Sequence, residues 1–417
     1  MMGTTPITMR VSAPCIAPAP RVVVVGNPES RRVALFQESL AARGLAPAVI
    51  VPYADLLAGR AALEPFVTEA AILRIESPDR DFDVERALIA AGAGENDEDA
   101  PARVGRIGRD EALRLDFDRG RILYPRQWYL GFRGLLRRIE RQRACCPPHL
   151  VMNRTDDIAV MFDKPTCHAL FEEHGVPCPP GLGTPRGYAD LCQRMDQAGM
   201  QRVFVKLAHG SSASGVVALE TDGRRVQATT TVEAVDSERG LRLYNTRAVR
   251  RLTDERQIAA VIDALCAERA HAERWVPKAS LAGGPFDLRV VVIGGRAMHA
   301  VARVGHSPMT NLHLKSQRAD PELVRSRMTP GAWDQFLHSC EQAAGVVPES
   351  LYTGVDVVIS PGFRRHAVLE INAFGDLLPG ILFKGQDTYS AELAALGRTA
   401  GRDPSCSAPS FSTSPAS

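Results

Sequence analysis

GVDVVISPGFRRHAVLEINAFGDLLPG, residues 354–380, is the stretch of sequence that decides the fold. Two short apolar runs rich in β-branched residues flank a Pro-Gly turn, a pattern typical of an antiparallel hairpin. Successive side chains of a strand alternate between its two faces. Glu370 and Asn372 are therefore expected on one face of the second strand, with Leu369 on the other.

The hairpin would bring two carboxylates and an amide together if its strands pair the right faces. Asp356, Glu370 and Asn372 would then point into one small volume. An unpaired carboxylate among Val and Ile side chains is costly, so Glu370 needs a cation or a proton. Carboxylate and amide oxygens suit Mg²⁺ held together with waters and nucleotide phosphates. The spacing alone leaves a second interpretation open, a half-exposed hairpin with ordinary polar residues.

The same stretch resembles the metal-binding end of the ATP-grasp superfamily, with Asp356, Glu370 and Asn372 in the three ligand positions. In that family, ATP lies between two α+β lobes and phosphorylates a carboxylate, and an amine usually attacks the resulting acyl phosphate. The resemblance therefore implies an α+β fold of two lobes, with ATP and Mg²⁺ as cofactors.

The composition limits the classes of protein to which the chain can belong. Its 417 residues have room for roughly two to four domains. A net charge of +2 implies neither a nucleic-acid nor a membrane partner, and no apolar run approaches the length of a membrane span. Nine cysteines without metal-type spacing argue against a disulfide framework, which favours a cytoplasmic protein. Residues 1–18 lack the apolar core of a signal peptide and are expected to form a flexible leader.

Residues 21–51 predict a strand, a helix and a second strand, which implies a right-handed parallel crossover. Gly26 is the only glycine of the dinucleotide fingerprint present, so a Rossmann-type nucleotide site is not expected here. ATP-grasp proteins typically begin with a small α/β lobe of this kind that holds substrate. We therefore predict a Rossmann-like N-terminal domain at 19–150, an ATP-grasp domain at 151–400 and a disordered tail at 401–417.

The segment 121–143 is strongly basic, with seven arginines against one glutamate. Leucine and isoleucine at helical spacing within it predict one buried stripe, and the prolines at 147 and 148 would end that helix. Arg133, Arg137 and their neighbours can be an ordinary solvated helix face or a dock for an acidic substrate or partner. The sequence leaves both interpretations open. The preceding segment, 92–104, predicts a surface loop rich in glycine and acidic residues.

Two lysines lie in motifs that resemble the nucleotide-binding parts of ATP-grasp enzymes. The pair Asp163-Lys164, followed by a helix and a Gly-Val-Pro exit, implies that Lys164 reaches the nucleotide phosphates. VFVKL predicts a strand that carries Lys206, before a small-residue loop at 209–215 whose backbone N–H groups can approach a phosphate closely. This loop resembles the phosphate-covering loop of the family. The nucleotide contacts implied there are Lys206, Ser211, Ser212 and Gly215.

HAERWVPKAS, residues 271–280, resembles the hinge strand that holds adenine through its backbone. The resemblance places Glu273, Arg274 and Val276 nearest the base and ribose. Lys278 is implied as a further ribose or phosphate contact.

FDLRVVVIGGRAMHAVARVG, residues 286–305, predicts a strong hairpin and resembles a segment of RimK-type ligases. Its Arg289 and Arg303, which accompany Asp287, are implied to neutralise phosphate or substrate charge. The next segment, TNLHLKSQRA, matches a second part of that subgroup, except that Lys315-Ser316 replaces a glycine pair. The matching positions in it are Asn311, His313 and Lys315.

The resemblance spans residues 150–390 and implies an Mg-dependent ligase that joins a carboxylate to an amine through an acyl phosphate. Lys206, Arg289 and Arg303 are the predicted catalytic residues. The substrates implied are small-molecule or peptide carboxylates and amines. The resemblance leaves open whether the protein forms an oligomer. Two alternatives stay open: a kinase of the same fold that phosphorylates a hydroxyl, and a non-catalytic nucleotide-binding protein.

Overall fold

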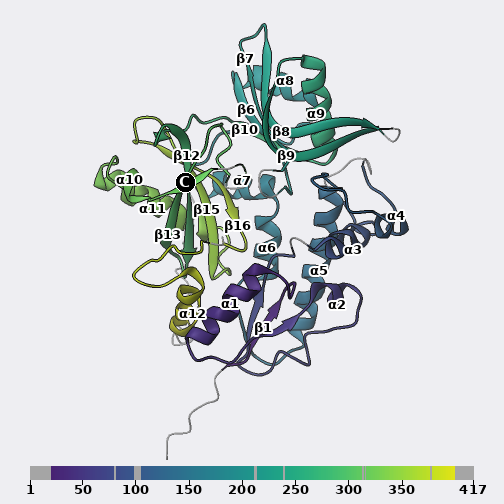
Figure 1. Cartoon of the computed structure of the whole chain (residues 1–417), viewed down its shortest axis with the longest axis vertical. Helices are drawn as coiled ribbons and strands as arrows, with labels where there is room; N and C mark the ends of the chain where they lie inside the picture. The colour runs from purple at the N-terminus through teal and green to yellow at the C-terminus, as the bar shows by residue number, and fades with distance from the viewer. Residues whose placement is uncertain are drawn as a thin grey trace, which may run out of the picture.

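The computed structural model describes residues 20–78, 81–97, 105–210, 214–237, 240–311, 314, 316–375 and 378–399. Three sheets succeed one another along the chain, and Figure 1 shows the first at the bottom, the second at the top and the third at the left. The predicted leader and tail lie outside the described residues, as do Ser211, Ser212, His313 and Lys315.

The N-terminal sheet is entirely parallel, in the order β2-β1-β3-β4. All four residues of Val22–Val25 are buried, because helices cover both faces of this sheet and the strand reads as an uninterrupted apolar run. The predicted parallel crossover is therefore confirmed. The elements of this region are β1 (Val22–Val25), α1 (Arg31–Ala42), β2 (Val49–Val51), α2 (Tyr53–Leu57), β3 (Ile72–Ile75), α3 (Phe82–Gly92), α4 (Arg109–Leu113), α5 (Pro125–Ala144) and β4 (Leu150–Val151).

The second sheet has the order β5-β10-β6-β7-β8-β9, and helices α8 and α9 pack on one of its faces. The predicted strand with Lys206 is β6, and it pairs antiparallel with β7 across the small-residue loop. The elements here are α6 (Thr155–Met161), α7 (Lys164–Glu173), β5 (Gly181–Gly183), α8 (Tyr188–Gln197), β6 (Arg202–Leu207), β7 (Val216–Thr221), β8 (Val226–Ser237), β9 (Gly240–Leu252), α9 (Glu255–Ala267) and β10 (Ala270–Arg274).

The third sheet runs β14-β13-β12-β15-β16, with β11 paired to β12. Alternate residues of β15, Val355 and Val357, pack with Phe336 of α11, which leaves the residues between them on the opposite face. The elements are β11 (Ser280–Leu281), β12 (Gly284–Ile293), β13 (Arg296–Val304), β14 (Gln317–Ala319), α10 (Glu322–Arg325), α11 (Pro330–Gly345), β15 (Tyr352–Ile359), β16 (His366–Asn372) and α12 (Thr388–Thr399).

The last helix returns to the N-terminal sheet, so that α12 lies beside α1 at the bottom of Figure 1. A fully buried Arg74 on β3 fixes this contact: its Nη1 lies 2.6 Å from Glu392 Oε2, and its Nη2 lies 2.6 Å from Glu76 Oε1. The guanidinium also lies over the Phe36 ring, 4.4 Å from its centroid. Removing Arg74 would leave two buried carboxylates, Glu76 and Glu392, without their shared cation, which makes α12 an integral part of this junction.

The predicted fold class, α+β with a small α/β lobe ahead of two α+β lobes, is confirmed by this arrangement. Within the described ranges, none of the helices has the length and apolar character needed to cross a membrane.

Candidate active site

The predicted hairpin is confirmed as β15–β16, and its register pairs Asp356 with Glu370 and Gly354 with Asn372, which meets the condition for bringing the polar residues together. The expectation for Leu369 is wrong. The register shifts between Asp356 and Val357, because Leu369 is an extra residue in β16, and this bulge interrupts the alternation of side chains. Leu369 consequently lines the same cavity as Glu370.

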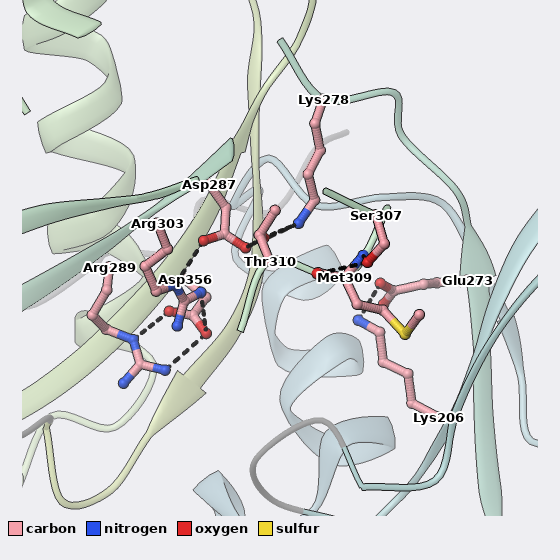
Figure 2. Close-up of polar contacts among 10 residues, drawn as sticks. All are labelled: Lys206, Glu273, Lys278, Asp287, Arg289, Arg303, Ser307, Met309, Thr310 and Asp356. Carbon is pink, nitrogen blue, oxygen red and sulfur yellow. Dashed lines mark hydrogen bonds and ion pairs between the residues drawn. The ribbon is translucent and has the colours of Figure 1, made fainter. Parts of the chain in front are cut away.

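Asp356 is buried and held by two arginines from neighbouring strands (Figure 2). Arg289 of β12 lies directly opposite it in the sheet and donates from Nε to Oδ1 and from Nη2 to Oδ2, the second at 2.8 Å. Arg303 of β13 approaches the same Oδ2 at 3.1 Å. Burial alone would raise the pKa of Asp356, but the two guanidinium groups hold it well below its usual range. The carboxylate is therefore ionised at neutral pH.

A second buried carboxylate, Asp287 of β12, continues this network. Arg303 donates from Nε to Asp287 Oδ1 at 2.7 Å, and Lys278 Nζ lies 2.9 Å from Oδ2. The Thr310 hydroxyl donates to the same Oδ2. Burial lowers the pKa of Lys278 in spite of the adjacent carboxylate. The predicted Arg303 and Lys278 thus both lie at the site, and Thr310 is a contact that the sequence analysis missed.

Lys206 and Glu273 form a buried ion pair on the opposite side of the view in Figure 2. They lie on the adjacent strands β6 and β10, and the Lys206 ammonium donates to Glu273 Oε1 at 2.5 Å. Burial alone would raise the pKa of the Glu273 carboxyl, but Lys206 and the imidazole of His271 lower it to about 2. Burial would lower the pKa of Lys206, but Glu273, above all, raises it. Both groups are therefore charged at neutral pH.

Lys164 is the first residue of α7, whose N-cap is Asp163. Its ammonium donates to the carbonyl oxygen of Gly210, at the start of the small-residue loop, at 2.6 Å. It also lies 3.7 Å from Glu370 Oε2. Lys164 thereby joins the loop of the second sheet to the carboxylates of the third.

His209, the residue before Gly210, is locked in place by helix α5 of the N-terminal region. Its ring stacks on Tyr129 with 3.9 Å between centroids, and its Nε2 lies 2.8 Å from Arg126 Nη1. Its Nδ1 lies 3.0 Å from the carbonyl oxygen of Phe162, so Nδ1–H donates there and Nε2 accepts from the arginine. Burial lowers the pKa of His209 to about 3, which keeps the ring neutral. The pattern of the basic segment, 121–143, did not predict that its Arg126 and Tyr129 would hold His209 at the start of the small-residue loop.

One cavity connects these groups, with an empty volume of about 810 Å³ that is partly open to solvent. Five cationic and four anionic side chains line it, so it is nearly balanced in charge before any ligand binds. The predicted site residues among its lining are Lys164, Lys206, Glu273, Arg274, Val276, Lys278, Arg303, Asn311, Asp356 and Glu370.

Of the predicted site residues that the structure describes, three are not among the cavity lining. Arg289 lies behind Asp356 and contacts it directly, as described above. Asn372 lies one residue pair along the hairpin, where its Nδ2 donates to the carbonyl oxygen of Gly354 at 3.2 Å. Gly215 follows the loop and accepts, through its carbonyl oxygen, a hydrogen bond from the Leu207 backbone N–H.

The oxygen donors on the hairpin fit a magnesium ion. Glu370 is half-buried, and Lys164 at 3.7 Å leaves its lone pairs available. The Asn372 amide turns its nitrogen toward Gly354, which leaves its oxygen free to accept or to ligate. Asp356 has further lone pairs beyond those used by the arginines. Two carboxylates and one amide oxygen form a hard donor set of the kind that Mg²⁺ takes together with phosphate oxygens.

The basic helix α5 is covered in part by the acidic segment before it. Arg137 pairs with Glu95, Arg133 donates to the carbonyl oxygen of Asn96 at 3.2 Å, and Arg126 pairs with Asp97. The helix is thus more than a solvated face, because the chain itself supplies acidic partners. Whether these arginines also dock an acidic substrate stays a prediction.

Gly215 gives a direct test of the loop geometry. Its φ of +64° is strained for any other residue, and a Cβ atom would lie 2.3 Å from Leu207 Cδ1. We expect Gly215→Ala to destabilise the protein by about 2–4 kcal/mol, from left-handed strain and overpacking together. Gly223→Ala is the matched control, since Gly223 has a φ of +86° but open space around its Cβ position. Urea unfolding of both variants measures the effect, and equal losses of stability would contradict the Leu207 contact.

Comparison with solved structures finds this architecture in proteins of very different sequence. The chain is similar to the D-cycloserine synthetase DcsG, with 12% identity and a TM-score of 0.52 over 91% of this chain and 99% of that chain. It is similar to the ATP-grasp ligase PsnB, solved with a minimal precursor, Mg and ADP, with 18% identity and a TM-score of 0.50 over 91% of this chain and 97% of that chain. A scan against protein-family models and a search of curated proteins found no match. At these identities the likeness concerns the fold.

Proposed function

We propose that this chain, which has the ATP-grasp fold, is an ATP-dependent ligase that joins a carboxylate to an amine through an acyl phosphate. The observation that carries the proposal is the convergence of Lys164, Lys206 and Glu370 on one cavity from three separate elements. Cationic groups for phosphates and hard oxygens for a metal meet there. The PsnB structure of the same fold contains Mg and ADP, which favours the same pair of ligands here.

In this proposal the nucleotide lies between the second and third sheets. The hinge residues Arg274 and Val276 line the end of the cavity beside β10, where the adenine and ribose would bind. Lys206 and Lys164 would contact the phosphates, and both now have carboxylate or carbonyl partners that the phosphates would replace. Asp356, Glu370 and Asn372 would hold Mg²⁺, which when bound offsets charge on the transferring phosphoryl group.

The chemistry requires activation of the carboxylate, because oxide is too poor a leaving group for direct attack by an amine. Transfer of the γ-phosphoryl group to the carboxylate gives an acyl phosphate and ADP, and the amine then displaces inorganic phosphate. Lys206 and Lys164 would stabilise the negative charge of the transferring group. Arg303, which lines the cavity, would orient the anionic acceptor. Fixed orientation of this kind can supply on the order of 7–11 kcal/mol of the barrier.

The two alternatives predict different outcomes for the same residues. A kinase would use the same lysines and metal ligands but would leave a stable phosphoester. A non-catalytic nucleotide-binding protein would be expected to have lost part of the site. Lys164, Lys206, Asp356, Glu370 and Asn372 are all present, which favours an enzyme over the binding protein.

The test is to incubate the protein with Mg²⁺, ATP and pools of carboxylic acids and amines. We expect ADP and free phosphate to form in equal amounts, and hydroxylamine to trap the intermediate as a hydroxamate. The Glu370→Gln variant is the matched negative control for contaminating ATPase activity. A stable phosphorylated product without free phosphate would favour the kinase, and no turnover with any pool would contradict the ligase proposal.

A further inference from the structure

A cluster of two histidines and a glutamate lies at the edge of the cavity, and only its glutamate, Glu273, belongs to the cavity lining. His168 comes from α7, and His271 and Glu273 from β10, so residues more than a hundred positions apart meet there. All three are buried, and one potential ligand atom of each lies within 4.8 Å of the other two. The two imidazole rings are 4.8 Å apart between centroids and inclined at 47°.

The hydrogen bond of His168 fixes which of its ring nitrogens is available. Its Nε2 lies 2.7 Å from the carbonyl oxygen of Pro179, which can only accept, so Nε2 carries the proton. The lone pair is consequently on Nδ1. Histidines that bind metals commonly donate their other N–H to a backbone carbonyl in this way, because the bond sets the tautomer and the ring orientation.

His271 is buried without a satisfied ring nitrogen. Within the described part of the chain, neither of its nitrogens has a hydrogen-bond partner, although its side chain is only 3% exposed. The nearest carboxylate oxygen, Glu273 Oε2, lies 3.5 Å from Nε2, at the outer limit of hydrogen bonding. A buried polar group left in this state costs free energy, so its presence calls for a partner that completes it.

We propose that His168, His271 and Glu273 form a binding site for a divalent transition cation of the zinc type. Two imidazole nitrogens and one carboxylate oxygen are a donor set that zinc takes with a water or a fourth ligand. The separation of 3.5 Å between the His271 nitrogen and Glu273 Oε2 is close to the ligand spacing of a tetrahedral site. His168 needs a small side-chain movement to complete the site.

Two neighbouring groups define the properties of this site. Lys206 holds the other oxygen of the same carboxylate, Glu273 Oε1, so its ammonium would oppose a cation and weaken its binding. Glu172 lies one helical turn after His168, and its Oε1 is 3.7 Å from His168 Nδ1, which places a second carboxylate beside the open coordination position. The site is distinct from the proposed magnesium site, whose donors are all oxygens and which lies on the third sheet.

The test uses the full chain without nucleotide, so that its outcome does not depend on the ligase proposal. Cys145→Ser and Cys146→Ser are introduced together, because these adjacent thiols near the surface could bind zinc themselves. Excess Mg²⁺ is present to occupy the oxygen donors of the hairpin. We expect calorimetry to show saturable binding of one Zn²⁺ per chain, and Co²⁺ to give the strong visible bands of a tetrahedral site without thiolate charge-transfer bands.

Variants then assign the ligands. His168→Gln and His271→Gln should each weaken Zn²⁺ binding by roughly 10- to 100-fold or more. The matched control is His299→Gln, since His299 is equally buried but lies in the third sheet and is bonded to the Gln386 carbonyl oxygen at 2.8 Å. Unchanged affinity in the two cluster variants, or equal loss in the control, would overturn the proposal.

X-ray absorption of the zinc-loaded parent protein gives a measurement that needs no histidine variant to fold. Two imidazole ligands and no sulfur shell are expected. A spectrum with oxygen ligands alone, or the absence of saturable binding in the parent, would refute the site.

Discussion

Glu370→Gln is expected to reduce turnover by roughly 100-fold or more while the fold remains intact. The substitution keeps the size and shape of the side chain but removes its charge. A metal ion contributes several kcal/mol to phosphoryl transfer, and each 1.36 kcal/mol corresponds to about a tenfold change in rate. Of the two carboxylates on the hairpin, Glu370 has the weaker contact with a cationic side chain, since its Oε2 lies 3.7 Å from Lys164 Nζ whereas Asp356 is held by two arginines. Glu370 is therefore the group best placed to bind a metal cation.

The measurement pairs the ATP turnover assay with calorimetry of Mg²⁺–ATP binding. Glu349→Gln is the matched control, because it removes the same charge from an exposed position of the same lobe, where the side chain is 62% exposed. The control should keep both activity and binding. Normal ADP release and unchanged Mg²⁺–ATP affinity in Glu370→Gln would show that this hairpin does not hold the metal.

Lys206→Met is expected to damage both nucleotide binding and stability. A charge-assisted hydrogen bond is worth about 1.5–3 kcal/mol, so loss of the phosphate contact should weaken ATP binding roughly 10- to 100-fold. The variant also leaves Glu273 buried without its ammonium partner. Breaking a buried pair on one side costs about 3–5 kcal/mol, which denaturant unfolding can detect.

The stability loss in Lys206→Met should depend on pH in a defined direction. In the parent protein the pKa of Glu273 is lowered to about 2. The ionised Glu273 carboxylate therefore stabilises the folded state fully above the ordinary carboxyl pKa, and this stabilisation is lost as the pH falls toward 2. Without Lys206, burial should raise this pKa instead, and the protonated form becomes the stable one. The gap in unfolding free energy between parent and variant should therefore be wider at pH 8 than at pH 5.

Two further variants distinguish the effect of breaking the Lys206–Glu273 ion pair from the effect of removing a positive charge elsewhere in the protein. Adding Glu273→Gln to Lys206→Met removes the orphaned carboxylate and should recover part of the stability, but not the ATP affinity. Lys384→Met deletes a lysine from an exposed position and should change neither. A stability gap that does not vary with pH would mean that the loss of stability does not come from the orphaned Glu273 carboxylate.

Much of the fold could be read from local patterns, because alternation and turn residues act over a few positions. The runs around Asp356 and Glu370 predicted the hairpin, which the structure confirms, and left the pairing of its polar faces conditional on the register. The strand with Lys206 and the hairpin with Asp287 and Arg303 were predicted by the same short-range pattern and confirmed in the same way. The roles of these residues in nucleotide and metal binding came from a family resemblance and stay predictions.

Only the tertiary structure decided what those side chains contact. The bulge at Leu369 depends on how β16 pairs with β15, and a strict period of two cannot reveal an extra residue. Lys206 and Glu273 are 67 positions apart, and their ion pair exists because β6 and β10 happen to be neighbours in the sheet.

The sequence by itself therefore determined the strand with Lys206 and the two hairpins of the third sheet, since alternation and turn residues within a few positions fix those elements. The packing of distant strands and helices decided that His209 is locked against α5, and that His168 meets His271 and Glu273. The physical reason is the same in each case. Burial removes water from polar groups, and each group must then find its partner among whichever elements the fold has brought alongside it.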